Sequence, residues 1–359
     1  MGEKPMHRHL IDLESYSTPV LERILARAMD IRRAPQAYAH ACEGKILATL
    51  FYEPSTRTQM SFQTAMLRLG GRTIGFDNPL NSSVAKGENL KDTITVVSGY
   101  ADLIAMRNPL EGSAFAAGLY AGCPLINAGD GGHLHPTQTL TDLVTLKVYK
   151  GGLQGLTIGL CGDLKNGRTV HSLIKTMCRF GAKFVLISTR GLTLPQYLKD
   201  FMNASGCSFR ECFRLEDAIG ELDVLYMTRI QRERFDSPEQ YEKERRVYCL
   251  DRQKMKRARQ NLIVLHPLPR VDEIEIAVDE DERAKYFEQA MCGVYARMSL
   301  LIDMLENDRE EPSPIHPLSM APACPNARCI VNHEPYLPCS FTQAGDILIC
   351  DYCEERLLR

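Results

Sequence analysis

Long apolar segments are missing from this chain of 359 residues. No run of about 18 apolar residues occurs, so the sequence predicts no transmembrane helix. The first ten residues, Met1–Leu10, lack the apolar core of a secretory signal. Residue 6 is Met, so the pattern for N-myristoylation fails as well. These absences favour a cytoplasmic protein without a membrane partner.

An excess of charge of one sign is also missing. The net charge is -2, so no global basic field attracts nucleic acid or an acidic membrane, and any anion site has to be local. Hydrophobic residues make up 44% and charged residues 25%, which is typical of a globular protein. The length suggests two domains of ordinary size with an appendage.

Several motifs that bind nucleotides or support hydrolysis are absent. The chain contains no G-x-G-x-x-G (the segment Gly159–Gly162 is a poor substitute) and no P-loop. It has neither the H-E-x-x-H nor the G-x-S-x-G pattern. We therefore expect no catalytic metal and no organic cofactor, and a site that acts through positioning and charge.

The stretch Phe51–Thr58 combines a strand end, hydroxyl groups and one arginine. The apolar run Lys45–Phe51 predicts a buried strand, and apolar residues at helical spacing from 62 to 69 predict a helix. Free N–H groups at the helix start favour an anion, and the guanidinium of Arg57 fits phosphate. An ordinary helix cap remains the alternative at Ser55.

Strands alternate with helices in two successive series. This pattern predicts two doubly wound parallel-sheet domains, at residues 1–150 and 151–283, with the helix at 284–306 closing the first. A linker at 307–322 and a small domain at 323–359 follow. Expected strands are 45–51, 72–77, 101–106 and 124–127, then 156–161, 183–187, 223–227 and 261–265. Expected helices are 17–33, 90–99, 114–121, 137–149, 168–180 and 193–205.

Polar side chains collect at the carboxyl ends of these strands, where open parallel sheets bind ligands. They are Ser55, Thr56, Arg57, Thr58, Arg107, His135 and Gln138 in the first half, and Asp163, Lys165, Arg168, Thr228, Arg229, Gln231 and 266–270 in the second. Exposed arginines are often no more than a solvated face. Arginines that each end a different strand point instead to one crevice for an anionic ligand.

Cysteines are numerous, at 13, and are unevenly distributed. Eight lie singly in the body of the chain, where buried free thiols are expected. Cys324 and Cys329, then Cys350 and Cys353, form C-x4-C and C-x2-C pairs, which predict a structural zinc site with four thiolates. Cys339 is a spare thiol and His333 a weaker alternative ligand. The alternative without a metal is a set of unliganded cysteines in an unstructured tail.

Five segments resemble the aspartate/ornithine carbamoyltransferases, and in particular aspartate carbamoyltransferase catalytic chains. They are Phe51–Thr58, Asn127–Asp130 with His135–Gln138, Gly162–Ser172, Leu225–Arg234 and His266–Arg270. The resemblance spans about residues 7 to 306, with the motifs in the family's order. It implies carbamoyl transfer from carbamoyl phosphate to the amino group of L-aspartate, an early step of pyrimidine synthesis.

The resemblance also implies residue roles. Ser55, Thr56, Arg57, Thr58 and Arg107 would bind the phosphate of carbamoyl phosphate. Arg57, Thr58 and His135 would be catalytic, donating to the carbonyl oxygen, although the protonation of His135 stays open. Gln138 and the carbonyls of Leu268 and Pro269 would hold the carbamoyl amide. Arg168 and Arg229, supported by Gln231, would clamp the aspartate carboxylates.

Ser82 and Lys86 lie in a polar loop, where a solvated lysine is the ordinary interpretation. The resemblance implies that a neighbouring subunit supplies both residues to the carbamoyl-phosphate site, in a homotrimer or a dimer of trimers. Lys86 would also bind aspartate. Ser83 is an equally good match for the serine. The charged segment Gln231–Arg246 is a candidate loop for closure over aspartate.

Aspartate is favoured over ornithine because Arg229 suits a dicarboxylate and because Pro267 stands where ornithine enzymes carry a cysteine. Another amine substrate is the runner-up, and a non-catalytic scaffold is disfavoured because all the site residues are present. The tail resembles the zinc domain of aspartate carbamoyltransferase regulatory chains. The nucleotide-binding domain that precedes it there has no room here, so nucleotide feedback should be missing. The tail carries few basic residues, which disfavours a nucleic-acid partner.

Overall fold

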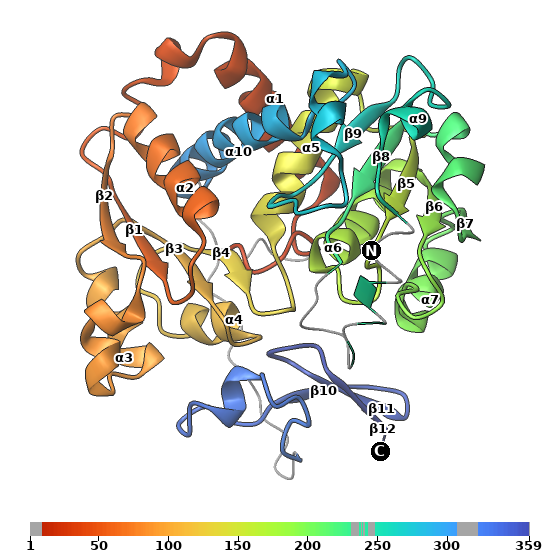
Figure 1. Ribbon diagram of the computed structural model, residues 1–359. Coiled ribbons are helices and arrows are strands. Elements are labelled where there is room, and N and C mark those ends of the chain that lie inside the picture. Colours follow the sequence, from red (N-terminus) through yellow and green to blue (C-terminus); the bar gives the residue numbers. More distant parts are fainter. Residues whose placement is uncertain are drawn as a thin grey trace. The chain divides into compact units, whose positions relative to one another are not determined.

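Parallel strands and helices alternate in two successive series, and a short antiparallel sheet follows them (Figure 1). The computed structural model describes residues 9–230, 237, 239, 241–242, 248–306 and 322–358. Contacts divide the chain into two compact units. The first unit comprises Met1–Thr137 and Val294–Arg359, and the second comprises Gln138–Gly293. The two parallel sheets with flanking helices and the additional C-terminal region confirm the predicted architecture.

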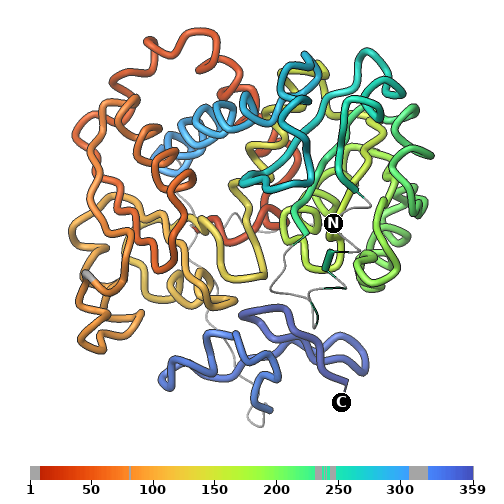
Figure 2. Tube along the Cα trace, in the orientation of Figure 1, coloured from red at the N-terminus to blue at the C-terminus, as the bar shows by residue number. Residues whose placement is uncertain are grey.

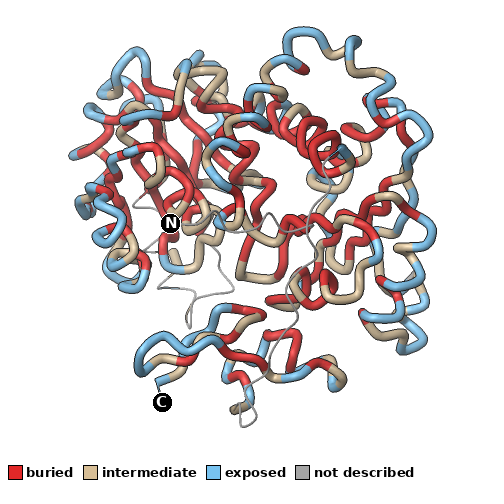
Figure 3. Tube along the Cα trace, turned by 180° about the vertical axis from the view of Figure 1, so that it is seen from behind, coloured by how far each residue is buried: buried red, intermediate tan, exposed pale blue. Residues whose placement is uncertain are grey.

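The first unit contains a four-stranded parallel sheet in the order β2-β1-β3-β4. Its strands are β1 (Ile46–Phe51), β2 (Arg72–Phe76), β3 (Leu103–Asn108) and β4 (Leu125–Asp130). Its helices are α1 (Thr18–Arg33), α2 (Thr56–Arg68), α3 (Leu90–Ser98) and α4 (Ser113–Gly118), with the 3-10 turns η1 (Pro35–Tyr38), η2 (Pro79–Asn81) and η3 (Ser83–Lys86). The strands β1, β3 and β4 are almost wholly buried, because helices cover them, whereas the edge strand β2 is largely exposed (Figure 3).

Two longer helices begin or end in this unit. They are α5 (Pro136–Lys150) and α10 (Tyr286–Glu306). The second half of α10 returns to the start of the chain, as the colours of Figure 2 show. Arg23 pairs with the buried Asp303 at 2.9 Å, and Ser299 Oγ donates to the carbonyl of Ile24 at 2.7 Å. Helices α1 and α10 are therefore joined by polar contacts.

The second unit contains a five-stranded parallel sheet in the order β7-β6-β5-β8-β9. Its strands are β5 (Thr157–Cys161), β6 (Lys183–Ile187), β7 (Phe209–Cys212), β8 (Val224–Met227) and β9 (Ile263–Leu265). Its helices are α6 (Arg168–Met177), α7 (Gln196–Ala204) and α9 (Arg252–Met255), with 3-10 turns at Cys178–Phe180, Leu215–Asp217, Ile219–Glu221 and Ile276–Glu280. Strand β7 was missed by the sequence analysis, because its residues alternate weakly and it lies at the sheet edge.

The C-terminal region folds as a small antiparallel sheet, β10-β11-β12, preceded by the turn η9 (Ile330–Asn332). Its strands are β10 (Phe341–Ala344), β11 (Ile347–Cys350) and β12 (Arg356–Leu358). Residues 322–358 are called the C-terminal module below. Its buried side chains, including Ile330 and Tyr352, share one hydrophobic core with Ile94 and Leu125 of the first unit.

No helix among the described residues is long and apolar enough to cross a membrane.

Candidate active site and metal centre

The strand order places two predicted arginines at the switch point of the first sheet. The chain runs from β1 to β2 on one side and then continues with β3 and β4 on the other. Ligands of open α/β sheets bind at the carboxyl ends of strands at such a point. Arg57 follows β1 at the start of α2, and Arg107 lies opposite Phe51 in β3. Burial and the charge of Arg107 lower the pKa of Arg57, which indicates that the two guanidinium groups lie close together.

Helix α2 begins directly at this point. Ser55 is its N-cap, and its carbonyl accepts from Gln59 N–H at 3.1 Å, but its hydroxyl makes no capping bond within the described residues. The ordinary cap interpretation therefore fails for the Ser55 side chain. The backbone N–H groups of the first turn and the Ser55 hydroxyl remain available for an anion.

Arg107 is held in place by two neighbours. Its Nε donates to Glu53 Oε1 at 2.7 Å, and its Nη1 reaches the carbonyl of Ala128 at 3.5 Å. Its side chain is only 13% exposed. Glu53 was not predicted as a functional residue, although it stands inside the same sequence motif as Ser55. The carboxylate fixes the orientation of the guanidinium, so Arg107 is preorganised.

His135 follows β4 and is buried. Its loop is organised by Asp130, a buried carboxylate that accepts from Leu134 N–H (2.9 Å), Gly112 N–H (2.9 Å) and Asn127 Nδ2 (3.1 Å). Thr137 Oγ1 lies 3.5 Å from His135 Nδ1 and also accepts from Arg297 Nη2 at 3.2 Å. The loop that presents His135 is therefore fixed by hydrogen bonds from both of its ends.

His133 lies in the same loop and faces two carboxylates. Its Nδ1 is 2.9 Å from Asp130, and its Nε2 is 3.7 Å from Glu354 of the C-terminal module. Burial opposes protonation, but the charges and hydrogen bonding of Asp130 and Glu354 outweigh it and raise the pKa of His133 well above its ordinary value. The two carboxylates therefore favour the protonated form of His133.

Gln138 belongs to the first turn of α5, and its amide is oriented by a carboxylate. Its Nε2 donates to Asp142 Oδ1 at 2.8 Å. The fully buried Asp142 also accepts from Gln289 Nε2 at 2.7 Å and from the Tyr226 hydroxyl at 3.1 Å. Sequence reasoning missed Asp142, because an aspartate in a helix shows no signal until its partners from α10 and β8 are known.

The second sheet repeats the arrangement of the first. The chain passes from β5 to β6 and β7 on one side, and then to β8 and β9 on the other, so β5 and β8 flank the switch point. Arg168 begins α6 after β5, and Arg229 follows β8. Gly162, at φ +121°, permits the close approach of the two strand ends, since a Cβ there would lie 2.5 Å from Thr228 Oγ1. Both arginines are half-buried.

The loop after β9 carries Leu268 and Pro269. Leu268 has a positive φ of 53°, and its N–H donates to His266 Nδ1 at 2.7 Å. His266 Nε2 in turn donates to Glu273 Oε1 at 2.7 Å, and both side chains are buried. Burial alone would raise the pKa of Glu273, but the hydrogen bond and charge of His266 lower it below the ordinary value. Glu273, which was not predicted, fixes this loop.

Ser82 and Lys86 lie in the two 3-10 turns between β2 and α3. Ser82 Oγ donates to the carbonyl of Pro79 at 2.7 Å and accepts from Val84 N–H at 3.3 Å. Ser83 and Lys86 are exposed. Ser82 is thus used locally for turn formation, and the choice between it and Ser83 stays a prediction. Gln231, and most of the segment Gln231–Arg246, lie outside the described residues.

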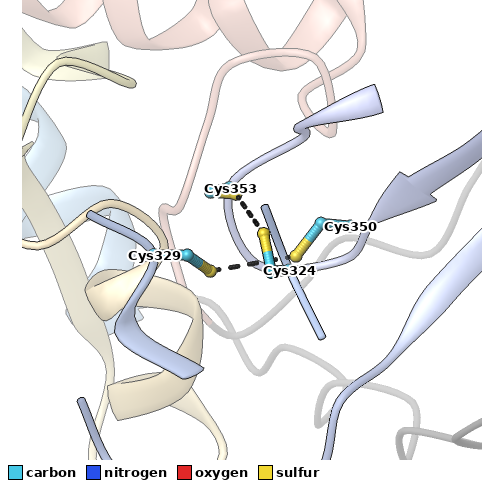
Figure 4. Close-up of side chains that lie close together, drawn as sticks. All are labelled: Cys324, Cys329, Cys350 and Cys353. Atoms are coloured by element: carbon cyan, nitrogen blue, oxygen red, sulfur yellow. Dashed lines mark hydrogen bonds between the residues drawn. The ribbon is translucent and has the colours of Figure 1, made fainter. Parts of the chain in front are cut away.

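The four predicted metal ligands come together in the C-terminal module (Figure 4). Each of the cysteines Cys324, Cys329, Cys350 and Cys353 is buried, and their sulfur atoms lie within 4.8 Å of one another. The Sγ atoms of Cys324 and Cys353 are 3.6 Å apart, and those of Cys329 and Cys350 are 3.9 Å apart. Tetrahedral Zn–S bonds of about 2.3 Å require sulfur separations of about 3.8 Å, so the cluster fits zinc.

The alternative ligands do not take part in this cluster. His333 is exposed and its Nε2 lies 2.9 Å from the carbonyl of Ala327, and Cys339 is not among the four grouped thiols. The eight cysteines of the chain body are free, and six of them are buried, as expected.

Comparisons with known proteins agree with this geometry. Residues 8–148 match the carbamoyl-phosphate-binding domain of the aspartate/ornithine carbamoyltransferases, and residues 154–304 match the Asp/Orn-binding domain. The chain is 56% identical over 301 residues to the aspartate carbamoyltransferase catalytic subunit of Clostridium perfringens, covering 83% of this chain and 98% of that protein. It is 55% identical over 300 residues to the corresponding subunit of Clostridium acetobutylicum, with the same coverage.

Solved structures give the same result. The catalytic subunit of aspartate transcarbamoylase from M. jannaschii has a TM-score of 0.79 and 45% identity, covering 83% of this chain and 98% of that one. The enzyme from Trypanosoma cruzi, in complex with N-(phosphonacetyl)-L-aspartic acid, has a TM-score of 0.78 and 36% identity, covering 84% and 97%.

The chain therefore belongs to the aspartate/ornithine carbamoyltransferase family. The two family matches end at residue 304, before the C-terminal module. Within the family it is a transferase of the aspartate type, an aspartate carbamoyltransferase catalytic chain.

Proposed function

We propose that the chain transfers a carbamoyl group from carbamoyl phosphate to L-aspartate with the residues predicted above, in an early step of pyrimidine synthesis. One observation carries the assignment of residues: each sheet brings two arginines to the carboxyl ends of the strands that flank its switch point. Carbamoyl phosphate and aspartate are both anions, and solved relatives from Trypanosoma cruzi hold these two molecules.

The first unit binds carbamoyl phosphate in this proposal. The hydroxyls and backbone N–H groups of Ser55–Thr58, with Arg57 and Arg107, hold the phosphate. Gln138 and the carbonyls of Leu268 and Pro269, which belong to the second unit, are the proposed partners of the carbamoyl amide. Lys86, with Ser82, completes the carbamoyl-phosphate site from a neighbouring chain, and Lys86 also binds aspartate.

The second unit binds L-aspartate. Arg168 and Arg229 pair with its two carboxylates, because a guanidinium offers a planar fork of donors. Gln231 supports Arg229. The neutral amine then attacks the carbonyl carbon, and Arg57, Thr58 and His135 donate to the carbonyl oxygen as negative charge develops there.

The reaction needs no electron transfer. A C–N bond forms, the bond between the carbonyl carbon and the bridging oxygen breaks, and phosphate leaves with the bonding electron pair. The amine loses one proton, which passes to the leaving phosphate. Most of the acceleration comes from holding the two substrates together and from preorganised donors.

Formation of N-carbamoyl-L-aspartate by the purified chain tests the proposal, with ornithine and other amines as competing substrates. We expect turnover of carbamoyl phosphate with aspartate and not with the other amines. Preference for another amine would contradict the aspartate clamp, and no turnover with any amine would leave a scaffold role as the better account.

Zinc is proposed as a structural ion of the C-terminal module. Cys324, Cys329, Cys350 and Cys353 would hold it, and it would supply no catalytic step. Support comes from the sulfur separations and from the small size of the module, which has little core of its own. Elemental analysis should find about one zinc per chain. A folded module without metal would contradict the proposal.

A homotrimer, or a dimer of trimers, is proposed for the assembly, within the cytoplasm and without a nucleic-acid or membrane partner. Exposed apolar side chains on α2 and in the turn η2 support it, since Met60, Leu67 and Leu80 are 60%, 58% and 75% exposed. Mixing inactive Lys86→Ala chains with inactive Arg57→Ala chains should restore activity if sites are shared. No recovery after verified subunit exchange would contradict sharing. CTP and ATP should have no effect away from the active site.

A further inference from the structure

The C-terminal module contacts three loops at the carboxyl edge of the first sheet, the edge at which Arg57 and His135 lie. The loops connect β2 to α3, β3 to α4 and β4 to α5. Two of them carry predicted site residues, Lys86 in the first and His135 in the third.

The first contact is at the start of α3. The N–H of Leu90 donates to Glu334 Oε1 at 3.1 Å, and the N–H of Lys91 donates to the Tyr336 hydroxyl at 3.0 Å. The next N–H, of Asp92, is taken by the helix's own cap, Asn89, at 2.8 Å. The module therefore supplies the partners for two N–H groups that a helix leaves unpaired, four and five residues after Lys86.

The second contact is centred on Glu111. Its N–H donates to the carbonyl of Arg328, and its carbonyl accepts from Ile330 N–H, both at 2.9 Å. One side-chain oxygen accepts from Asn326 Nδ2 at 2.6 Å, and the other accepts from Gly132 N–H at 3.2 Å. Glu111 thus links the module directly to the loop of His135.

The third contact reaches that loop from another direction. Glu354 follows the last cysteine ligand, and its carboxylate lies 3.7 Å from His133 Nε2. The side chain of His133 is 10% exposed and its other nitrogen is bound to Asp130. Gly112, at φ +79°, allows the backbone of Tyr352 to approach, because a Cβ would lie 2.5 Å from its carbonyl oxygen.

We propose that the C-terminal module is an intramolecular positioning element for the carbamoyl-phosphate site. Its contacts with Glu111, His133 and the start of α3 fix the loops that carry His135 and Lys86. The four-cysteine metal site in turn holds Asn326, Glu334 and Glu354 in the positions that these contacts require. This inference rests on the proposed function of the first unit. Glu334, Glu354, Glu111 and His133 are positioning residues in it and touch no substrate.

Variants that keep the cysteines provide the test. Glu334→Ala removes the acceptor for Leu90 N–H, whereas Glu334→Gln keeps an oxygen there and should behave as wild type. Glu354→Gln removes the charge beside His133, and Glu355→Gln is its matched control, because Glu355 is an exposed neighbour on the same turn. All are prepared in the full chain, with zinc content measured for each.

We expect the double variant Glu334→Ala/Glu354→Gln to retain zinc but to raise the KM for carbamoyl phosphate about tenfold, less than the ~100-fold that a 1 Å misplacement of a reacting group costs. Amide exchange at Leu90, Lys91 and Leu134 should accelerate, while Thr228 in the second unit stays unchanged. Phosphate binding by calorimetry should weaken in parallel.

Wild-type KM and wild-type exchange in the zinc-loaded double variant would overturn the inference, and so would faster exchange with unchanged KM and phosphate affinity. Absence of turnover in wild-type chain would instead count against the proposed function, and phosphate binding would still decide whether the module positions the site.

Discussion

The two parallel-sheet units both place a pair of arginines at strand ends, but different contacts fix the loops beside each pair. Each brings two arginines to the strands beside its switch point, Arg57 and Arg107 in one and Arg168 and Arg229 in the other. In the first unit, the neighbouring loops make hydrogen bonds to the C-terminal module, which carries a cluster of four cysteines. In the second, the loop after β9 is held by residues of that loop, through His266 and Glu273. The loops beside a candidate site can therefore be fixed by their own residues or by an added module.

Loss of the proposed metal ligands should have the largest effect, and this effect should differ between the two units. Structural zinc contributes on the order of 10 kcal/mol to folding in small zinc domains. We expect the double variant Cys329→Ser/Cys353→Ser to abolish the protection of the module's amides from hydrogen exchange. Amide exchange in α3 should also increase, with little change in the second sheet. Hydrogen exchange with mass spectrometry measures this.

The matched control is Cys339→Ser, which changes a cysteine of the module outside the cluster and should leave exchange unchanged. Equal destabilisation of both sheets by loss of the ligands would show that the module does not act on the first unit selectively.

Substitution of the arginines should have a smaller effect, and it should change different kinetic constants in the two units. Arg57→Ala removes a donor to the phosphate and the oxyanion, and we expect kcat to fall about 10²–10³-fold. Arg229→Ala should chiefly raise the KM for aspartate and leave phosphate binding intact. Steady-state kinetics and calorimetry with phosphate distinguish them.

Arg68→Ala is the control for the first substitution, since Arg68 is exposed at the far end of the same helix. Loss of phosphate binding in Arg229→Ala would contradict the division of substrates between the units.

Glu273→Gln should lower the free energy of unfolding by about 1.5–3 kcal/mol, the range for a hydrogen bond to a charged group. The folded state lowers the pKa of Glu273 from 4.5, so the carboxylate stabilises the fold above about pH 4.5, and this contribution is lost as the pH falls through the folded pKa. The difference in unfolding free energy between wild type and variant should therefore be full at pH 7 and shrink in acid.

Chemical denaturation at several pH values measures that difference. The exposed Glu275→Gln is a suitable control two residues away. A difference that is constant down to pH 3 would contradict the role of the ionised carboxylate.

The smallest effect is expected for Glu53→Gln, which keeps the shape beside Arg107 but removes the charge that orients it. An orienting hydrogen bond of this kind contributes about 1 kcal/mol, so the KM for carbamoyl phosphate should rise severalfold with the KM for aspartate unchanged. An equal change in both constants would mean that Glu53 does not act on the phosphate site alone.

Local sequence patterns predicted most of the fold. The strands β1, β5 and β6 are buried apolar runs, and their bounds fall within one residue of the expectation. Weakly patterned elements were missed, namely β7 and the three short strands of the module. Their residues are half exposed or lie beside the four clustered cysteines, so no period of two or of 3.6 residues marks them.

The sequence by itself predicted the chemistry of the candidate site, because arginines, hydroxyls and paired cysteines indicate their ligands by residue type and spacing. Only the tertiary structure decided which residues support them. Glu53, Asp142, Glu273 and Glu354 are carboxylates with no local signal, and each acquires its role from a partner brought near by the fold. Such contacts depend on strand order and on packing between distant segments, which sequence periodicity does not encode.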